Sequence, residues 1–108
     1  MKKLTLNEQI FLIAIWHLKD NAYGVTIREK IGELAGDAPM FGTLYNTLDY
    51  LVRKEYVVTA KGESTAQRGG HNKVYYRLTE EGRTALQKAR ELQSALWRGI
   101  PSPAFKAK

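Results

Sequence analysis

Few residues in this sequence have the types and spacing that covalent catalysis needs. The chain has no cysteine, so thiolate chemistry and cysteine-ligated zinc are excluded, and His17 and His71 alone make a poor metal site. Ser64 stands in no activating motif that would pair it with a histidine. Glu80 and Glu81 are adjacent, and on a helix they would diverge by about 100°. We therefore expect no enzyme, no metal and no cofactor.

A second set of polar side chains is suited to reading DNA. Its members recur at helical spacing around one leucine, Leu48, and are Thr43, Asn46, Tyr50, Arg53 and Lys54. With Leu48 at the centre of a buried face, a rotation of about 100° per residue puts the set on the opposite, solvent-facing side. Asparagine can bind adenine through two hydrogen bonds, arginine can bind guanine likewise, and hydroxyls suit phosphates. The alternative explanation is an ordinary hydrated surface.

Helical periodicity places this set on the third of four expected helices. The box Thr5-x-x-Glu8 predicts the start of the first helix, and a similar box, Thr26-x-x-Glu29, predicts the start of the second. Gly36 is expected to end the second helix. The third should end near residue 55, and its apolar face consists of Phe41, Leu44, Leu48, Leu51 and Val52.

After this helix the apolar period changes from about 3.6 to about 2, which predicts a β-hairpin. Its strands are expected at residues 56–61 and 72–78, joined by a polar stretch at 62–71. The core face of the second strand should hold Val74, Tyr76 and Leu78. Its basic aromatic face should hold Lys73, Tyr75 and Arg77. The residues of the hairpin expected to contact DNA are Arg68, His71, Lys73 and Tyr75.

The last helix, about 79–99, has an apolar stripe without an obvious partner in the chain. Thr79 should cap its start, and Gly99 and Pro101 should end it. The stripe consists of Ala89, Leu92, Leu96 and Trp97. A monomer of this size would leave the stripe exposed to water. We therefore expect a homodimer in which Phe11 and Ile15 of the first helix also contact the partner.

The two tryptophans, Trp16 and Trp97, lie on the helices that are expected to meet at the dimer interface. A roomy pocket needs a second copy, because a 108-residue chain encloses too little volume by itself. Both tryptophans are therefore candidates for binding a planar aromatic effector. A role in a core or interface is the more frequent one for tryptophan, and it stays open here.

Composition indicates one soluble, basic domain. Seventeen Lys and Arg against eleven Asp and Glu leave a net charge of +6, which favours a polyanionic partner such as DNA. The domain is expected to cover residues 1–99, with a disordered tail at 100–108. The apolar run Ile10–Trp16 is too short for a membrane span and has no cleavage site of a secretory signal after it. We therefore expect a cytoplasmic protein.

The order of these elements is that of a winged helix-turn-helix, a mainly α fold with a small antiparallel β-hairpin and, here, a C-terminal dimerisation helix. The chain also resembles the PadR-like transcriptional regulators. The segments that carry this resemblance are Tyr23-Gly24, Gly42-Thr43-Leu44-Tyr45 and Tyr76-Arg77-Leu78-Thr79-Glu80-Glu81-Gly82-Arg83. The resemblance implies a homodimeric repressor that binds a near-palindromic operator and is released by a small effector. It adds Gly42 and Tyr45 to the expected DNA contacts.

Three departures from the family pattern bear on DNA binding. Asn46 stands where the family usually has proline, which adds an amide hydrogen and a base-reading side chain. The stretch 68–73 is less basic than the corresponding family stretch, and Val25 replaces an aromatic residue. An alternative function, from another class, is a non-enzymatic winged-helix module that binds a protein or structured RNA through the same basic face.

Overall fold

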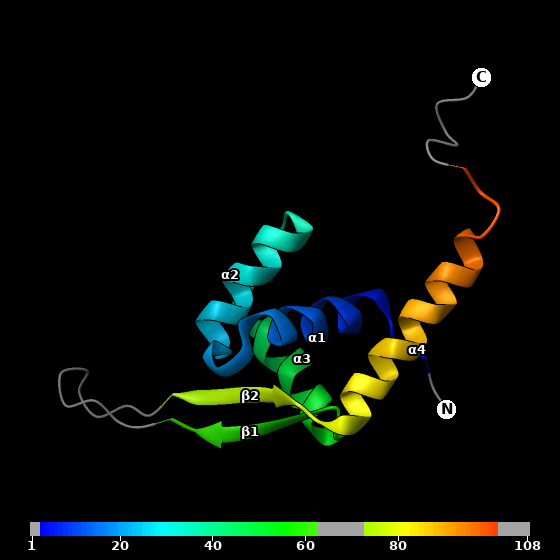
Figure 1. Cartoon of the computed structure of the whole chain (residues 1–108). Helices are drawn as coiled ribbons and strands as arrows, with labels where there is room; N and C mark the ends of the chain where they lie inside the picture. Colours follow the sequence, from blue (N-terminus) through cyan, green and yellow to red (C-terminus); the bar gives the residue numbers. More distant parts are fainter. Residues whose placement is uncertain (1–2, 63–72, 102–108) are drawn as a thin grey trace.

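The computed structural model describes residues 3–62 and 73–101, which form four α-helices and one antiparallel hairpin. The first three helices lie on one side of the hairpin, and the last helix projects away from one end of it (Figure 1). The elements in chain order are α1 (Leu6–Leu18), the short 3-10 helix η1 (Lys19–Asn21), α2 (Gly24–Ala35), α3 (Phe41–Arg53), β1 (Val57–Lys61), β2 (Val74–Leu78) and α4 (Glu80–Trp97). This is the predicted mainly α fold with a two-stranded sheet. None of the described helices is long and apolar enough to cross a membrane.

Helix α1 is the central helix of the core. The predicted capping box starts it: the Thr5 amide donates to Glu8 Oε1 at 2.9 Å, and the Glu8 amide donates to Thr5 Oγ1 at 3.1 Å. Its fully buried side chains are Phe11, Leu12, Ala14 and Ile15. Since these cover more than one stripe, α1 packs against several elements at once, as its sequence indicates.

Helix α2 begins earlier than the sequence predicts. Its N-cap is Tyr23, and Thr26 lies inside the first turn, so the expected box at Thr26 and Glu29 is wrong. The Thr26 hydroxyl instead accepts from the Tyr23 amide at 3.0 Å and donates to the Asn21 carbonyl at 2.6 Å. Gly36 ends the helix in the left-handed conformation, with φ of 82°, as predicted.

Helix α3 packs with the predicted face. Leu44, Leu48 and Leu51 have no exposed surface, which fixes the orientation of the helix about its axis. Phe41 was expected on the same face, but its side chain is 52% exposed because the first turn extends past the core. The helix ends at Arg53, close to the expected end near residue 55.

The two strands pair in the register Val57↔Leu78 to Lys61↔Val74. Tyr76 and Leu78 face the core as predicted, whereas Val74 is 41% exposed because the far end of the hairpin leaves the core. The start of α2 joins the sheet edge: Tyr23 bridges Tyr75, and the Tyr76 amide donates to the Ala22 carbonyl at 2.8 Å. The positions of the expected contacts Arg68 and His71 lie outside the described residues.

Helix α4 starts against the sheet and then leaves the body of the molecule (Figure 1). The Thr79 hydroxyl caps it by accepting from the Gly82 amide at 3.0 Å, as predicted, and donates to the Glu55 carbonyl at 2.6 Å. Ala85 is buried and Leu86 and Ala89 are partly covered, whereas the apolar positions nearer the C-terminal end are exposed. They include Leu92, Leu96 and Trp97. Of the expected tail at 100–108, residues 102–108 lie outside the described residues.

Candidate nucleic-acid interface

The outer face of α3 presents polar side chains to solvent. Thr43, Asn46 and Arg53 are exposed, as expected, and none of them hydrogen-bonds another side chain in residues 3–62 and 73–101. Their donors and acceptors are therefore available to a bound molecule. Asparagine and arginine on one exposed helix face are the side chains that most often read adenine and guanine in the major groove.

The structure corrects the position of Tyr50. This side chain is half-buried and packs against the hydrophobic core, with the Lys54 Nζ atom 5.8 Å from its ring centroid. Leu44 and Leu51 are buried together with Leu48, so the buried face of α3 is wider than one centred on Leu48 alone. Tyr50 lies within reach of this wider face and is therefore partly covered. Asp49, which the sequence reasoning left out, lies on the exposed face.

Tyr45 joins α3 to the beginning of α2. Gly24 is buried, and a β-carbon added to it would overlap the Tyr45 hydroxyl. The small residue therefore lets the tyrosine lie across the first turn of α2 while 43% of the side chain stays exposed. Two segments of the family resemblance, Tyr23-Gly24 and the one that ends at Tyr45, meet at this contact.

The connection between α2 and α3 is held by Arg28. Its Nε donates to the Pro39 carbonyl at 2.7 Å, and its guanidinium carbon lies 4.7 Å from the centroid of the Phe41 ring. A charge-assisted hydrogen bond and a cation–π contact thus act on the residues just before and at the start of α3. The sequence reasoning missed this role, because neither contact follows from helical periodicity.

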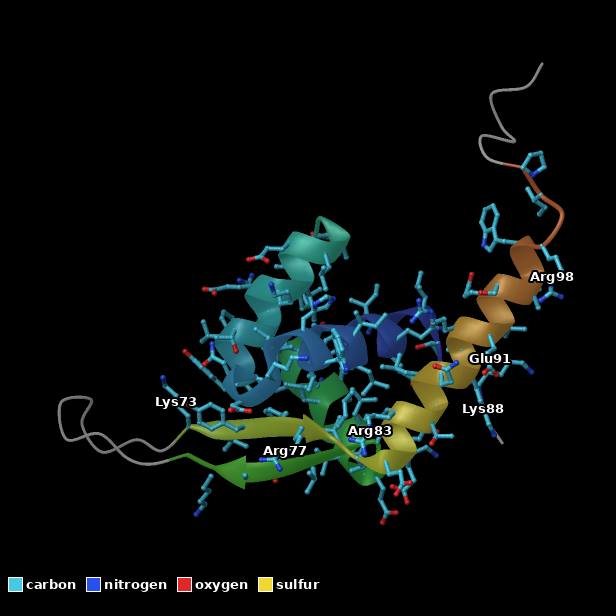
Figure 2. The ribbon with its side chains drawn as sticks, viewed as in Figure 1. Lys73, Arg77, Arg83, Lys88, Glu91 and Arg98 are labelled. Carbon is cyan, nitrogen blue, oxygen red and sulfur yellow. The ribbon has the colours of Figure 1, made fainter. Side chains whose placement is uncertain are left out.

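The β1–β2 hairpin is the wing of this fold, and at its end remote from α4 Lys73 and Tyr75 meet Tyr23 at the start of α2. Figure 2 shows Lys73 at the end of β2 that adjoins the first turn of α2, and its Nζ atom lies 4.3 Å from the centroid of the Tyr23 ring. Tyr23 and Tyr75 meet edge to face at 5.4 Å. Tyr75, an expected DNA contact, is therefore half-buried against Tyr23, whereas Lys73 is exposed as expected.

Tyr76 lies behind α3 with a perturbed hydroxyl. Burial raises the pKa of this tyrosine above its ordinary value of 10.0, and the nearby Asp49 and Tyr45 raise the pKa further. The negative charge of Asp49 thus disfavours the ionised form of Tyr76 in addition to the effect of burial.

A groove of about 620 Å³ runs between α1 and α4, remote from the outer face of α3. Its walls include Ile13, Trp16 and Leu86, with Arg83 and Arg90 from α4. Figure 2 shows Arg83 on the first turns of α4, Lys88 and Glu91 farther along that helix, and Arg98 just after its end. A ligand in this groove would contact Trp16, whereas Trp97 is not among the residues that line it.

Two residues of the expected dimer interface are wrongly assigned. Phe11 is 0% and Ile15 is 2% exposed in the single chain, so neither has surface to offer a partner. The exposed apolar residues of α1 are instead Leu6, Ile13 and Trp16. Sequence periodicity could not separate the two sets, because α1 is apolar on nearly all sides.

The helix-turn-helix, the wing and their joint at Tyr23 define a protein of the winged-helix class. Within that class, residues 14–88 match the model of the transcriptional regulator PadR-like family. The chain therefore belongs to the PadR-like family, as the sequence resemblance indicates, and it is a DNA-binding transcriptional regulator. No curated protein matches the sequence.

Solved structures agree with this assignment. A PadR-like transcription factor from Bacteroides fragilis is 27% identical, with a TM-score of 0.72, over 84% of this chain and 82% of that one. RosR of H. salinarum is 25% identical, with a TM-score of 0.69, over 97% of this chain and 87% of that one. A winged-helix DNA-binding protein of STIV, at 17% identity and a TM-score of 0.65, covers 91% and 98% and shares the fold.

Proposed function

We propose that this protein is a homodimeric repressor that binds a near-palindromic operator and is released by a small effector. The observation that carries the proposal is the outer face of α3, where Asn46 and Arg53 are exposed and bond no other side chain of the described residues. A helix with this face fits the major groove, and the wing then reaches the adjacent part of the duplex. The net charge of +6 supplies the attraction to phosphates.

Dimerisation is supported by the exposed apolar side chains of α4. Leu96 is 60% and Trp97 53% exposed, on turns of the helix that extend beyond the rest of the molecule (Figure 1). Ala89 is partly covered, and Leu92 is 37% exposed. Burying such a stripe against a second copy removes apolar area from water at roughly 25 cal/mol per Å². Two recognition helices in one dimer would account for a near-palindromic operator.

Release by an effector is supported by the groove between α1 and α4. Its indole wall, Trp16, can stack on a planar ring, and Lys19 already lies 3.9 Å from the centroid of that ring. A ligand that separates or joins α1 and α4 would change the angle between the dimerisation helix and the DNA-binding part. The distance between the two recognition helices would change with it.

The test is a mobility shift with the purified protein and a fragment that carries its own promoter. Retarded DNA that resists an excess of unrelated competitor, together with lower transcription from that promoter in a reconstituted reaction, is the expected result. If the unrelated fragment competes for the protein as well as the promoter fragment does, the alternative function, a module that binds a protein or structured RNA, replaces this one. Activation of transcription instead of its reduction would overturn the repressor role while leaving operator binding intact.

A further inference from the structure

The exposed face of α3 holds one acidic side chain, Asp49, among residues that suit DNA binding. It follows Asn46 by three positions and precedes Arg53 by four, so the three side chains are neighbours on the helix surface. Leu48, the residue before it, has no exposed surface and points into the core. Asp49 is about 100° around the helix from Leu48, so it lies at the edge of the outer face of α3, beside the residues that the proposed function turns toward the base pairs.

Asp49 has no hydrogen-bond or ion-pair partner among the described residues, and its electrostatic interaction with Tyr76 is a repulsive one that raises the pKa of that tyrosine. Within residues 3–62 and 73–101, Asp49 forms no ion pair within 4.0 Å and accepts no hydrogen bond. Arg53 is placed one turn away, where an aspartate and an arginine commonly pair, but the two do not meet. A structural role for the carboxylate as a helix cap is also excluded, because Asp49 is in the middle of α3.

An unpaired carboxylate on such a face has two consequences for DNA binding. It repels the phosphates of every duplex, and its desolvation in the groove costs free energy unless a donor meets it. In the major groove, aspartate and glutamate find that donor in the amino group at N4 of cytosine. The carboxylate thus weakens binding to most sequences and weakens it least where a cytosine faces the helix.

We propose that Asp49 is a specificity-determining residue that accepts a hydrogen bond from the amino group of a cytosine in the operator and opposes binding to other sequences. This inference rests on the proposed function, because it needs α3 to enter the major groove. It assigns Asp49 a role opposite in sign to that of Arg53. Arg53 raises affinity for the operator by pairing with a base edge, whereas Asp49 lowers affinity for the wrong DNA.

The experiment measures binding of Asp49→Ala and Asp49→Asn to the operator, to a scrambled duplex and to operators with one base pair changed per half-site. Both variants should bind the scrambled duplex several-fold more tightly than the wild type, since a like charge near the phosphates is removed. Asp49→Ala should also lose about a tenfold preference for cytosine at one position of each half-site and keep the preferences at the others. Circular dichroism checks that α3 is intact.

The matched control is Glu91→Gln, which makes the same change in net charge on α4, away from α3 (Figure 2). Equal tightening by Glu91→Gln and Asp49→Asn would overturn the proposal, because overall charge would then explain the gain. So would an unchanged preference at every position in both Asp49 variants. A wild-type protein that prefers no duplex overturns the proposed function as well. A selective wild type with unaffected Asp49 variants overturns this inference alone.

Discussion

Three glycines in contrasting surroundings show how individual residues determine the packing near the interface. A β-carbon on Gly82 would overlap the Tyr56 carbonyl oxygen, which belongs to the backbone and cannot move aside. A β-carbon on Gly24 would meet the end of the Tyr45 side chain, which can rotate away, and Gly42 has open space around it. The three positions therefore differ in which property a substitution should change.

Substituting each glycine with alanine should separate stability from DNA binding. We expect Gly82→Ala to lower the free energy of unfolding by about 1–3 kcal/mol, because the overlap forces the backbone to shift. Gly42→Ala should raise it by up to about 1 kcal/mol, since alanine favours the helix. Gly24→Ala should cost little stability but weaken operator binding by displacing Tyr45. Urea unfolding measures the change in stability, and titration with operator DNA measures the change in affinity. Equal losses of stability in the variants at positions 82 and 42 would contradict the difference in space around these two glycines.

The raised pKa of Tyr76 predicts a loss of stability at alkaline pH. A tyrosine whose pKa is higher in the folded state keeps its proton more tightly there, so its contribution is complete below about pH 10 and falls as the pH rises through the folded value. Urea midpoints between pH 8 and pH 11.5 should therefore decline less in Tyr76→Phe than in the wild type. Tyr75→Phe serves as the control, and identical declines in all three proteins would exclude Tyr76 as the cause.

At the scale of elements, α3 and the wing divide affinity and specificity between them. Lys73, at the end of the wing remote from α4, has a flexible charged side chain suited to a phosphate, whereas Asn46 and Arg53 carry the planar groups that read base edges. Tyr23 links the two elements, because it caps α2, bridges β2 and contacts Lys73. The helix-turn-helix thus contributes directly to orienting the wing.

Alanine substitutions in the two elements should affect DNA binding differently: those in the wing should lower affinity, and those in α3 should lower sequence preference. Lys73→Ala should weaken binding to all duplexes alike and reduce the slope of log affinity against log salt by about one for each phosphate that the lysine neutralises. Asn46→Ala or Arg53→Ala should cost roughly 1–3 kcal/mol for each bidentate base pairing that the variant removes, and relax the preference at one operator position. Titrations of specific and scrambled duplexes across a salt series check this. Reduced selectivity in the Lys73 variant with unchanged selectivity in the other two would reverse the assignment.

At the scale of the whole molecule, the long α4 is the element whose apolar side chains a single chain does not bury. Its first turns are held by the sheet, but its last turns contact little else of the described chain and expose leucine and tryptophan. A stripe of this kind is stable in water when a second copy covers it. The assembly that we propose would bring two α3 helices to one duplex.

Replacing Leu92 and Leu96 together by glutamate should give a folded monomer. Both side chains are exposed in the single chain, so the double variant should leave the core and its helical content unchanged. Operator binding should fall strongly, because one recognition helix then acts alone. Analytical ultracentrifugation measures the mass, and a matched variant with Gln87→Glu tests for a general effect of charge on α4. A wild-type monomer at tens of micromolar would contradict the dimer.

Binding of an effector in the groove between α1 and α4 should be detectable as a change in tryptophan fluorescence. A planar aromatic compound that weakens operator binding should quench the emission, and Trp16→Phe should remove most of the quenching because Trp16 lines the groove. The quenching should survive in Trp97→Phe unless the partner's helix completes the pocket. If planar compounds change neither fluorescence nor operator binding, the effector part of the proposed function fails and the tryptophans serve packing.

Features that depend on neighbours within a few turns of chain could be predicted from the order of the residues. Capping at Thr5 and Thr79 and the end of α2 at Gly36 follow from local hydrogen bonds and dihedral preferences, and the polar face with Asn46 and Arg53 follows from helical period. All of these interactions are formed between residues of one helix or its ends. They therefore produce a pattern of residue types at fixed spacing, which can be recognised in the sequence.

Which apolar and aromatic side chains are covered, and by what, depends on the folded arrangement. Phe11 is buried while Trp16, on the same apolar helix, is exposed, because the positions of α2, α3 and the sheet select the covered side. Tyr23 starts α2 because β2, which lies some fifty residues later in the chain, holds its backbone in extended form. Burial depends on contacts between segments far apart in sequence, and a periodicity within one segment cannot specify its partner.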